Sequence, residues 1–199
     1  MFNGIIKATG KIVKIERKNN NCLLVIKTKM NFKKDEIGSS VSCSGACLTV
    51  ERIKPNLVEF FLSKETLKKT IFRLSKMGDI INLEKPLKFG QRISGHFVQG
   101  HVDTVSLVKK IHFVGRSWVI NFKIQKKYSK FLVQKGSITI NGVSLTIAKK
   151  LYNGFQIAII PKTLELTNLG KLKEKDFVNV EIDILSKYEK RNLKLKLKI

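Results

Sequence analysis

Two short polar pairs are the groups best suited to do chemistry: Cys47 with Thr49, and Ser144 with Thr146. The members of each pair stand two positions apart, so in a β-strand their side chains would lie on one face. Such a face can bind a polar substrate, and a thiol that ionises can act as a nucleophile. A second interpretation stays open at this point, in which these small side chains only fill two tight barrel interiors.

Two histidines form a further candidate group. His96 and His101 enclose the segment Phe-Val-Gln-Gly, and Gly95 and Gly100 precede them. Imidazole is suited to proton transfer near neutral pH. Glycine lets backbone approach a ligand closely, although a barrel corner has the same need. The segment is therefore a candidate site with a structural alternative.

Both groups belong to an internal duplication. Val41–Val50 reads VSCSGACLTV, and Ile138–Ile147, 97 positions later, reads ITINGVSLTI. Other pairs keep nearly the same separation: Gly4 with Gly100, Thr66 with Thr163, and Ile81–Glu84 with Val178–Glu181. A repeat near half the chain length indicates one duplicated domain, because solenoid repeats are much shorter. We expect domains at 1–94 and 95–186, followed by a segment at 187–199.

Each half predicts six strands and a short helix. Ser44-Gly45 and Asn141-Gly142 separate runs of alternating polarity, which indicates two-residue hairpin turns. Strands are expected at 5–16, 22–27, 41–50 (as a hairpin), 57–62 and 79–83, and at 100–111, 117–124, 138–147, 155–160 and 177–182. Helices are expected at 64–73, 128–133 and 161–168, with a linker at 85–94. This pattern favours an all-β fold of two small closed barrels.

Composition excludes several classes of protein. The 199 residues are 43% hydrophobic, which argues against disorder. No apolar run is long enough to span a membrane, and the first residues do not resemble a signal peptide. The net charge of +24 comes from lysines spread through both halves. Specific nucleic-acid recognition is therefore not expected. Three cysteines give neither a disulfide framework nor a zinc site, and the chain is predicted to be cytoplasmic.

With these duplicated motifs, the sequence resembles the alpha-chain type of riboflavin synthase, a family with lumazine-binding repeats. The motifs MFxGII, GxCLTV, ETL, GDxxNLE, GHxVQGHVD, NGVSLT, PxTLExTxLG and KYxxR occur in this order over nearly the full length. The resemblance implies a homotrimer, with two Greek-key barrels and a C-terminal helix in each chain. It also implies the dismutation of two 6,7-dimethyl-8-ribityllumazine molecules to riboflavin and a ribitylaminopyrimidinedione, without cofactor or metal.

The resemblance also implies the substrate-binding residues. The domain starts contribute Gly4, Ile5, Ile6, Gly100, His101 and Val102. The first barrel adds Cys47, Leu48, Thr49, Phe61, Leu62, Ser63, Lys64, Glu65 and Thr66. The second barrel adds Lys135, Ser144, Leu145, Thr146, Ala158, Ile159, Ile160, Pro161, Lys162 and Thr163.

The residues expected to act in catalysis are His101, as a proton-transfer group, and Cys47 and Ser144, as polar groups near the reacting carbon. Whether Cys47 adds to the ring or only packs against it stays open. So does the tail, where leucines alternating with lysines suit a strand as well as a helix.

Two other functions are compatible with parts of the pattern. One is a lumazine- or flavin-binding protein of the same fold that catalyses nothing, for which degraded motifs in one half would be expected. The other is a nucleic-acid-binding barrel, which would require exposed aromatic residues among the lysines. Whether the basic surface binds a partner such as lumazine synthase is not determined by the sequence.

Overall fold

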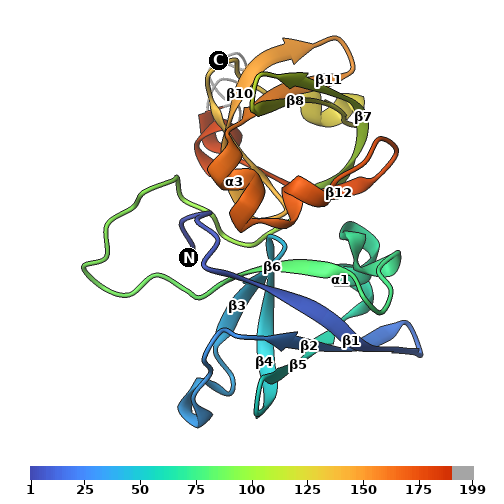
Figure 1. Cartoon of the computed structure of the whole chain (residues 1–199), viewed down its shortest axis with the longest axis vertical. Helices are drawn as coiled ribbons and strands as arrows, with labels where there is room; N and C mark the ends of the chain where they lie inside the picture. Colours follow the sequence, from blue (N-terminus) through green and yellow to red (C-terminus); the bar gives the residue numbers. More distant parts are fainter. Residues whose placement is uncertain (190–199) are drawn as a thin grey trace, which may run out of the picture.

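The computed structural model describes residues 1–189 and consists of two closed antiparallel barrels, one above the other in Figure 1. The first barrel contains β1 (Ala8–Lys18), β2 (Asn21–Thr28), β3 (Ser40–Cys43), β4 (Ala46–Lys54), β5 (Leu57–Leu62) and β6 (Ile80–Glu84). The second contains β7 (Thr104–Val114), β8 (Ser117–Lys123), β9 (Ser137–Ile140), β10 (Val143–Leu151), β11 (Gly154–Ile159) and β12 (Phe177–Ile182). The strand order is β1-β2-β5-β4-β3-β6 in the first barrel, and the second repeats it with the equivalent strands. The predicted all-β twin-barrel fold is confirmed.

The strand alternation places the polar pairs outside the barrels. On β4, Leu48 and Val50 are buried in the core of the first barrel, whereas Cys47 is half-buried and Thr49 is exposed. On β10, Ile147 lies in the second core and Thr146 is exposed. Ser144 is half-buried, and neither core cluster contains a member of either pair. The interpretation in which these side chains fill the barrel interiors is therefore wrong for both pairs.

The two predicted hairpin turns meet where the barrels join. Both residues of each turn have positive φ, 43° and 83° for Ser44 and Gly45, and 46° and 80° for Asn141 and Gly142. This is the geometry of a type I′ turn. A Cβ on Gly45 would lie 2.7 Å from the backbone nitrogen of Gly142. The turns therefore need glycine for their close approach as well as for their conformation.

Buried asparagines tie each turn to the opposite barrel. The side-chain amide of Asn82 on β6 donates to the carbonyl of Asn141 at 2.8 Å, and Asn179 on β12 donates to the carbonyl of Ser44 at the same distance. Buried carbonyls need such partners. Because the two bonds are equivalent, they give the junction an approximate twofold symmetry.

The segment that leads into the first strand of each barrel packs against the other barrel. Phe2 and Val98 exchange two backbone hydrogen bonds of 2.7 and 3.2 Å. Beyond this bridge, Ile6 packs into the core of the second barrel, and Val102 packs into the core of the first. Burying one such side chain stabilises by about 1.5–3 kcal/mol. Each barrel is thus completed by the start of the other.

The helices are shorter than the sequence predicts. They are α1 (Lys64–Lys69), α2 (Lys126–Ser129) and α3 (Pro161–Leu166), with 3₁₀ turns η1 (Lys34–Glu36), η2 (Ile71–Arg73) and η3 (Asn168–Lys171). The expected helix at 64–73 breaks at Thr70, an extended residue whose hydroxyl caps the next turn by accepting from the Phe72 amide. Thr167 breaks the expected helix at 161–168 in the same way.

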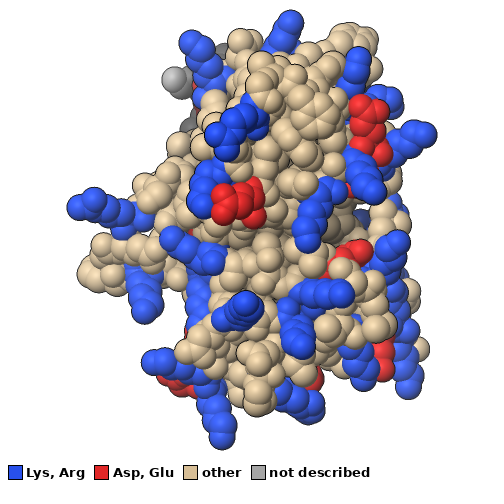
Figure 2. Space-filling model, viewed as in Figure 1, with Lys and Arg blue, Asp and Glu red and all other residues tan. Residues whose placement is uncertain are grey.

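The last described residues of the chain form a helical turn. Residues 184–189 are helical, and the rest of the predicted C-terminal segment lies outside the described residues. Within residues 1–189, no helix is long and apolar enough to cross a membrane. Figure 2 shows lysine and arginine scattered over the visible face rather than gathered in one block.

Candidate substrate-binding site

A cavity of about 370 Å³ opens beside Cys47 on the outer face of the first barrel. It brings together residues of β4, of α1, of the segment that leads into β7, and of the C-terminal helical turn. Its lining consists of Ala46, Cys47, Glu65, Thr66, Lys69, Thr70, Gln99, Gly100, His101, Val102, Asp103 and Lys187. Six of these residues (Cys47, Glu65, Thr66, Gly100, His101 and Val102) were predicted from the sequence to bind substrate.

Gly100 allows the leading segment to lie directly on β4. Its carbonyl accepts a 2.8 Å hydrogen bond from the Cys47 amide. Its φ is +79°, and a Cβ there would lie 2.6 Å from the Cβ of Cys47. Only glycine fits this position without displacing backbone. The contact fixes His101, the next residue, at the edge of the same cavity as Cys47.

A buried carboxylate holds this segment from the other side. Glu181 on β12 accepts hydrogen bonds from the amides of Gln99 at 2.8 Å and Gly100 at 2.9 Å. Burial raises the pKa of Glu181, while the two amide donors and the charge of Lys187 oppose that rise. Glu181 is thus a positioning group for Gly100 and His101.

The cavity combines groups that suit a polar heterocycle with a hydroxylated chain. Ala46 and Cys47 of β4 line it, and Thr66 and Lys69 of α1 add a hydroxyl and an ammonium donor. His101 is exposed and free to meet a bound molecule. Asp103, which accepts from the Ile182 amide and pairs with Lys187 at 2.7 Å, also lines the cavity.

The second barrel repeats the arrangement around Ser144. The Ser144 amide donates to the Gly4 carbonyl at 2.8 Å, and Gly4, with a φ of +73°, has no room for a Cβ against Ser144. Glu84 accepts from the amides of Asn3 at 2.8 Å and Gly4 at 3.0 Å. Its pKa is raised by burial, as it is for Glu181.

The Ser144 hydroxyl has a hydrogen-bond partner within the chain, the imidazole of His96. His96 shares a 2.7 Å hydrogen bond with the Ser144 hydroxyl through Nδ1, and Nε2 lies 3.2 Å from the hydroxyl of Thr139. Burial lowers the pKa of His96, and the carboxylate of Asp183 opposes this shift. Sequence reasoning marked the two histidines together, but it assigned a role to His101 alone.

The other predicted residues divide between surface and core. Phe61 at the end of β5 and Ile160 after β11 are large apolar side chains that are 50% and 60% exposed. Leu48, Leu62 and Ile159 are buried in the two cores, so their side chains stabilise the barrels. Gly4 is buried against Ser144, and Ile6 is buried in the second core. The remaining positions outside the cavity are exposed or half-buried: Ile5, Thr49, Ser63, Lys64, Lys135, Leu145, Thr146, Ala158, Pro161, Lys162 and Thr163.

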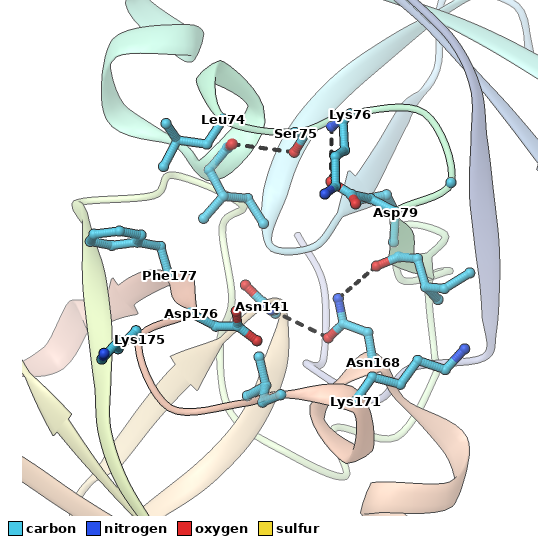
Figure 3. A pocket seen from close by; sticks show the side chains of 15 residues that line it. Leu74, Ser75, Lys76, Asp79, Asn141, Asn168, Lys171, Lys175, Asp176 and Phe177 are labelled. Carbon is cyan, nitrogen blue, oxygen red and sulfur yellow. Dashed lines mark hydrogen bonds between the residues drawn. The ribbon is translucent and has the colours of Figure 1, made fainter.

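A larger cavity, of about 470 Å³, lies between the barrels but serves the junction (Figure 3). The Asn168 side chain donates to the Ile80 carbonyl at 2.9 Å and accepts from Asn141 at 3.3 Å. The Asp79 carboxylate accepts from the Lys76 amide at 2.9 Å. These polar groups already have partners, and none of the predicted site residues lines this cavity.

The chain is a twin-barrel protein with two related faces, at Cys47 and at Ser144, and each face is bordered by a glycine from the opposite barrel. The model of the lumazine binding domain matches twice, at residues 3–86 and 99–183. Riboflavin synthase of Escherichia coli is 40% identical over 92% of this chain and 87% of its own length, and that of Photobacterium leiognathi is 38% identical over 98% and 90%.

Solved structures agree with the sequence comparison. LumP in complex with riboflavin aligns with a TM-score of 0.81 at 30% identity, covering 92% of this chain and 99% of LumP. LumP in complex with 6,7-dimethyl-8-(1'-D-ribityl) lumazine aligns with a TM-score of 0.79. The chain belongs to the riboflavin synthase family of lumazine-binding domain proteins.

Proposed function

We propose that the chain catalyses the riboflavin synthase reaction, in which two molecules of 6,7-dimethyl-8-ribityllumazine give riboflavin and 5-amino-6-(ribitylamino)pyrimidinedione. The observation that carries this proposal is the pairing of two equivalent faces, at Cys47 and Ser144, in one chain. A reaction between two copies of one heterocycle needs two related sites. A protein that only stores a ligand needs one.

The reaction suits a protein that contributes positioning and proton transfer. One lumazine gives up a four-carbon unit and becomes the pyrimidinedione, and the other gains that unit and becomes riboflavin. The electron-poor ring stabilises the carbanion formed at its 7-methyl group, so no external oxidant or reductant enters. Holding two reactants together can contribute roughly 7–11 kcal/mol, and a general acid or base about 10²–10⁴-fold.

The first-barrel cavity supplies groups for both tasks. Cys47 lies beside the ring, and Thr66 and Lys69 meet the ribityl hydroxyls. His101 transfers the proton, because it lines the same cavity and Gly100 fixes its backbone beside Cys47. Ser144 has the corresponding place in the second barrel.

Reaction requires the two bound rings to touch, so we propose a homotrimer in which the first barrel of one chain faces the second barrel of its neighbour. The exposed apolar side chains of Phe61 and Ile160 support this contact, since each lies in a predicted binding segment of its barrel. They would be covered in the assembly.

A lumazine- or flavin-binding protein without catalysis is the second candidate, and the likeness to LumP favours it. Incubating the purified chain with 6,7-dimethyl-8-ribityllumazine separates the two. Appearance of riboflavin absorbance at a rate proportional to protein concentration supports the enzyme. A change in lumazine fluorescence with no riboflavin after prolonged incubation would establish the second candidate instead.

A further inference from the structure

The two binding faces share one arrangement of side chains across three neighbouring strands. In the first barrel, Cys47 pairs across strands with Ser42, and Ser42 with Glu84. In the second barrel, Ser144 pairs with Thr139, and Thr139 with Glu181. In both rows the glutamate accepts two backbone amides from a leading segment.

The two barrels differ at the positions that precede the glutamate, which are Cys47 and Ser42 in the first barrel and Ser144 and Thr139 in the second. In the second barrel the imidazole of His96 bridges both hydroxyls, that of Ser144 at 2.7 Å and that of Thr139 at 3.2 Å. In the first barrel a cavity lies beside Cys47. Within the described part of the chain, the buried hydroxyl of Ser42 has no hydrogen-bond partner.

The imidazole has the hydrogen-bonding character of the expected ligand. A neutral imidazole presents one donor and one acceptor nitrogen in the plane of a flat ring. The pyrimidinedione ring of a lumazine or flavin likewise presents N–H donors and carbonyl acceptors in its plane. His96 therefore satisfies the Ser144–Thr139 pair as a bound heterocycle would.

The backbone before His96 is held at Asn3, whose side chain donates to the Arg92 carbonyl at 3.1 Å and accepts from the Ser94 amide at 3.2 Å, so a heterocycle would have to displace only the side chain of His96. His96 lies between β6 and β7, where the preceding residues 91–95 are exposed. Its own amide makes a 3.3 Å hydrogen bond to the Asn3 carbonyl, and Gly95 packs against that carbonyl and Ser144. Neither core cluster includes His96.

We propose that His96 is an internal ligand of the second-barrel site, which it occupies in the free protein and must leave before a heterocycle binds to Ser144. The first-barrel site then fills first and the second site binds more weakly, because ligand there must displace His96. This inference rests on the proposed function, since it takes both faces to be heterocycle sites.

The test is equilibrium titration with riboflavin, the reaction product and an unreactive probe. The parental chain should bind riboflavin at one tighter and one weaker site per chain. In His96→Ala the weaker site should tighten about tenfold, as expected when a ligand no longer displaces hydrogen bonds of this strength. The tighter site should not change. His112→Ala, the same change on β7, should leave both sites as they are.

The results distinguish a failure of this inference from a failure of the proposed function. Unchanged or weakened binding at the second site in a folded His96→Ala variant overturns the inference, as do two equal sites in the parental chain. No riboflavin binding at all in the parental chain would instead contradict the proposed function. If His96→Ala does not fold, ¹⁵N spectra of the parental histidine rings decide. The His96 signals must shift with the second binding step, and a shift with the first step overturns the inference.

Discussion

At the scale of single residues, Cys47, Ser144 and His101 carry the proposed chemistry. Cys47→Ser and Ser144→Ala should each lower turnover substantially, because each alters the polar group beside the reacting ring. His101→Gln should lower turnover by about 10²–10⁴-fold with substrate binding retained, since the variant keeps a polar side chain but cannot take up a proton. Steady-state riboflavin formation, with binding measured separately, checks all three. Near-parental turnover in all three variants would refute these roles.

His96 should make stability depend on pH. Because burial lowers its pKa below the ordinary value of 6.5, the unfolded chain binds more protons than the folded chain just below that value. The free energy of unfolding should therefore fall as the pH drops through this window. In His96→Gln this component should disappear.

Urea unfolding of both proteins at about pH 7.5 and about pH 5.5 measures the difference. The raised pKa values of Glu84 and Glu181 act in the opposite direction, but they are common to both proteins. His112→Gln is the matched control. An identical pH dependence in the parental chain and His96→Gln would show that His96 is not held in its neutral form.

The sequence predicts part of this site for a clear reason. Cys47 and Thr49 lie on one face because strand side chains alternate, and alternation is a local property. The same alternation turns the side chains of Leu48, Leu62 and Ile159 into the barrel cores. A continuous stretch that the family resemblance assigns to substrate binding therefore also contains core residues. The contact of His96 with Ser144 joins residues far apart in the chain, and no local pattern reports it.

At the scale of elements, the segments that lead into each barrel hold the two faces together, because each lies across the opposite barrel. Gly100→Ala should destabilise the chain by several kcal/mol, because a Cβ there meets the backbone of Cys47 and φ is +79°. Gly90→Ala is the matched control, since φ is +76° and no heavy atom of residues 1–189 outside its chain neighbours lies within 4 Å of the added Cβ. It should lose only about 1–2 kcal/mol.

Denaturant unfolding measures both variants, and riboflavin formation by Gly100→Ala shows whether Cys47 and His101 are still held together. An equal loss of stability in the two alanine variants would mean that the close approach to Cys47 has no energetic importance. The strands and hairpin turns follow from alternation and from turn residues. The packing of each leading segment against the other barrel does not follow from the sequence. The apolar side chains of Ile6 and Val102 would be equally suited to the cores of their own barrels.

At the scale of the whole molecule, duplication provides two faces, and the proposed association of chains would bring them together. We predict a trimer by sedimentation velocity at micromolar concentration, with the exposed side chains of Phe61 and Ile160 covered by neighbouring chains. Phe61→Glu should weaken association and lower turnover together, because a charge would be buried at the contact. Phe113→Glu is the control: Phe113 is 69% exposed on β7, and its replacement should affect neither property.

A sedimentation profile of monomer alone, from a preparation that forms riboflavin, would rule out the proposed arrangement of neighbouring chains. The sequence predicts the two barrels because the repeat covers nearly the whole chain. It gives no direct signal for their association, since exposed apolar residues can be recognised only after the fold has placed them.

The central claim is that two copies of one heterocycle react with each other on this protein. The most direct measurement is product stoichiometry, in which lumazine consumed, riboflavin formed and the ribitylaminopyrimidinedione formed are quantified in one reaction mixture. We expect equal amounts of the two products and twice that amount of lumazine consumed. Lumazine that remains unconsumed by the folded protein, or riboflavin formed without the pyrimidinedione, would contradict this claim.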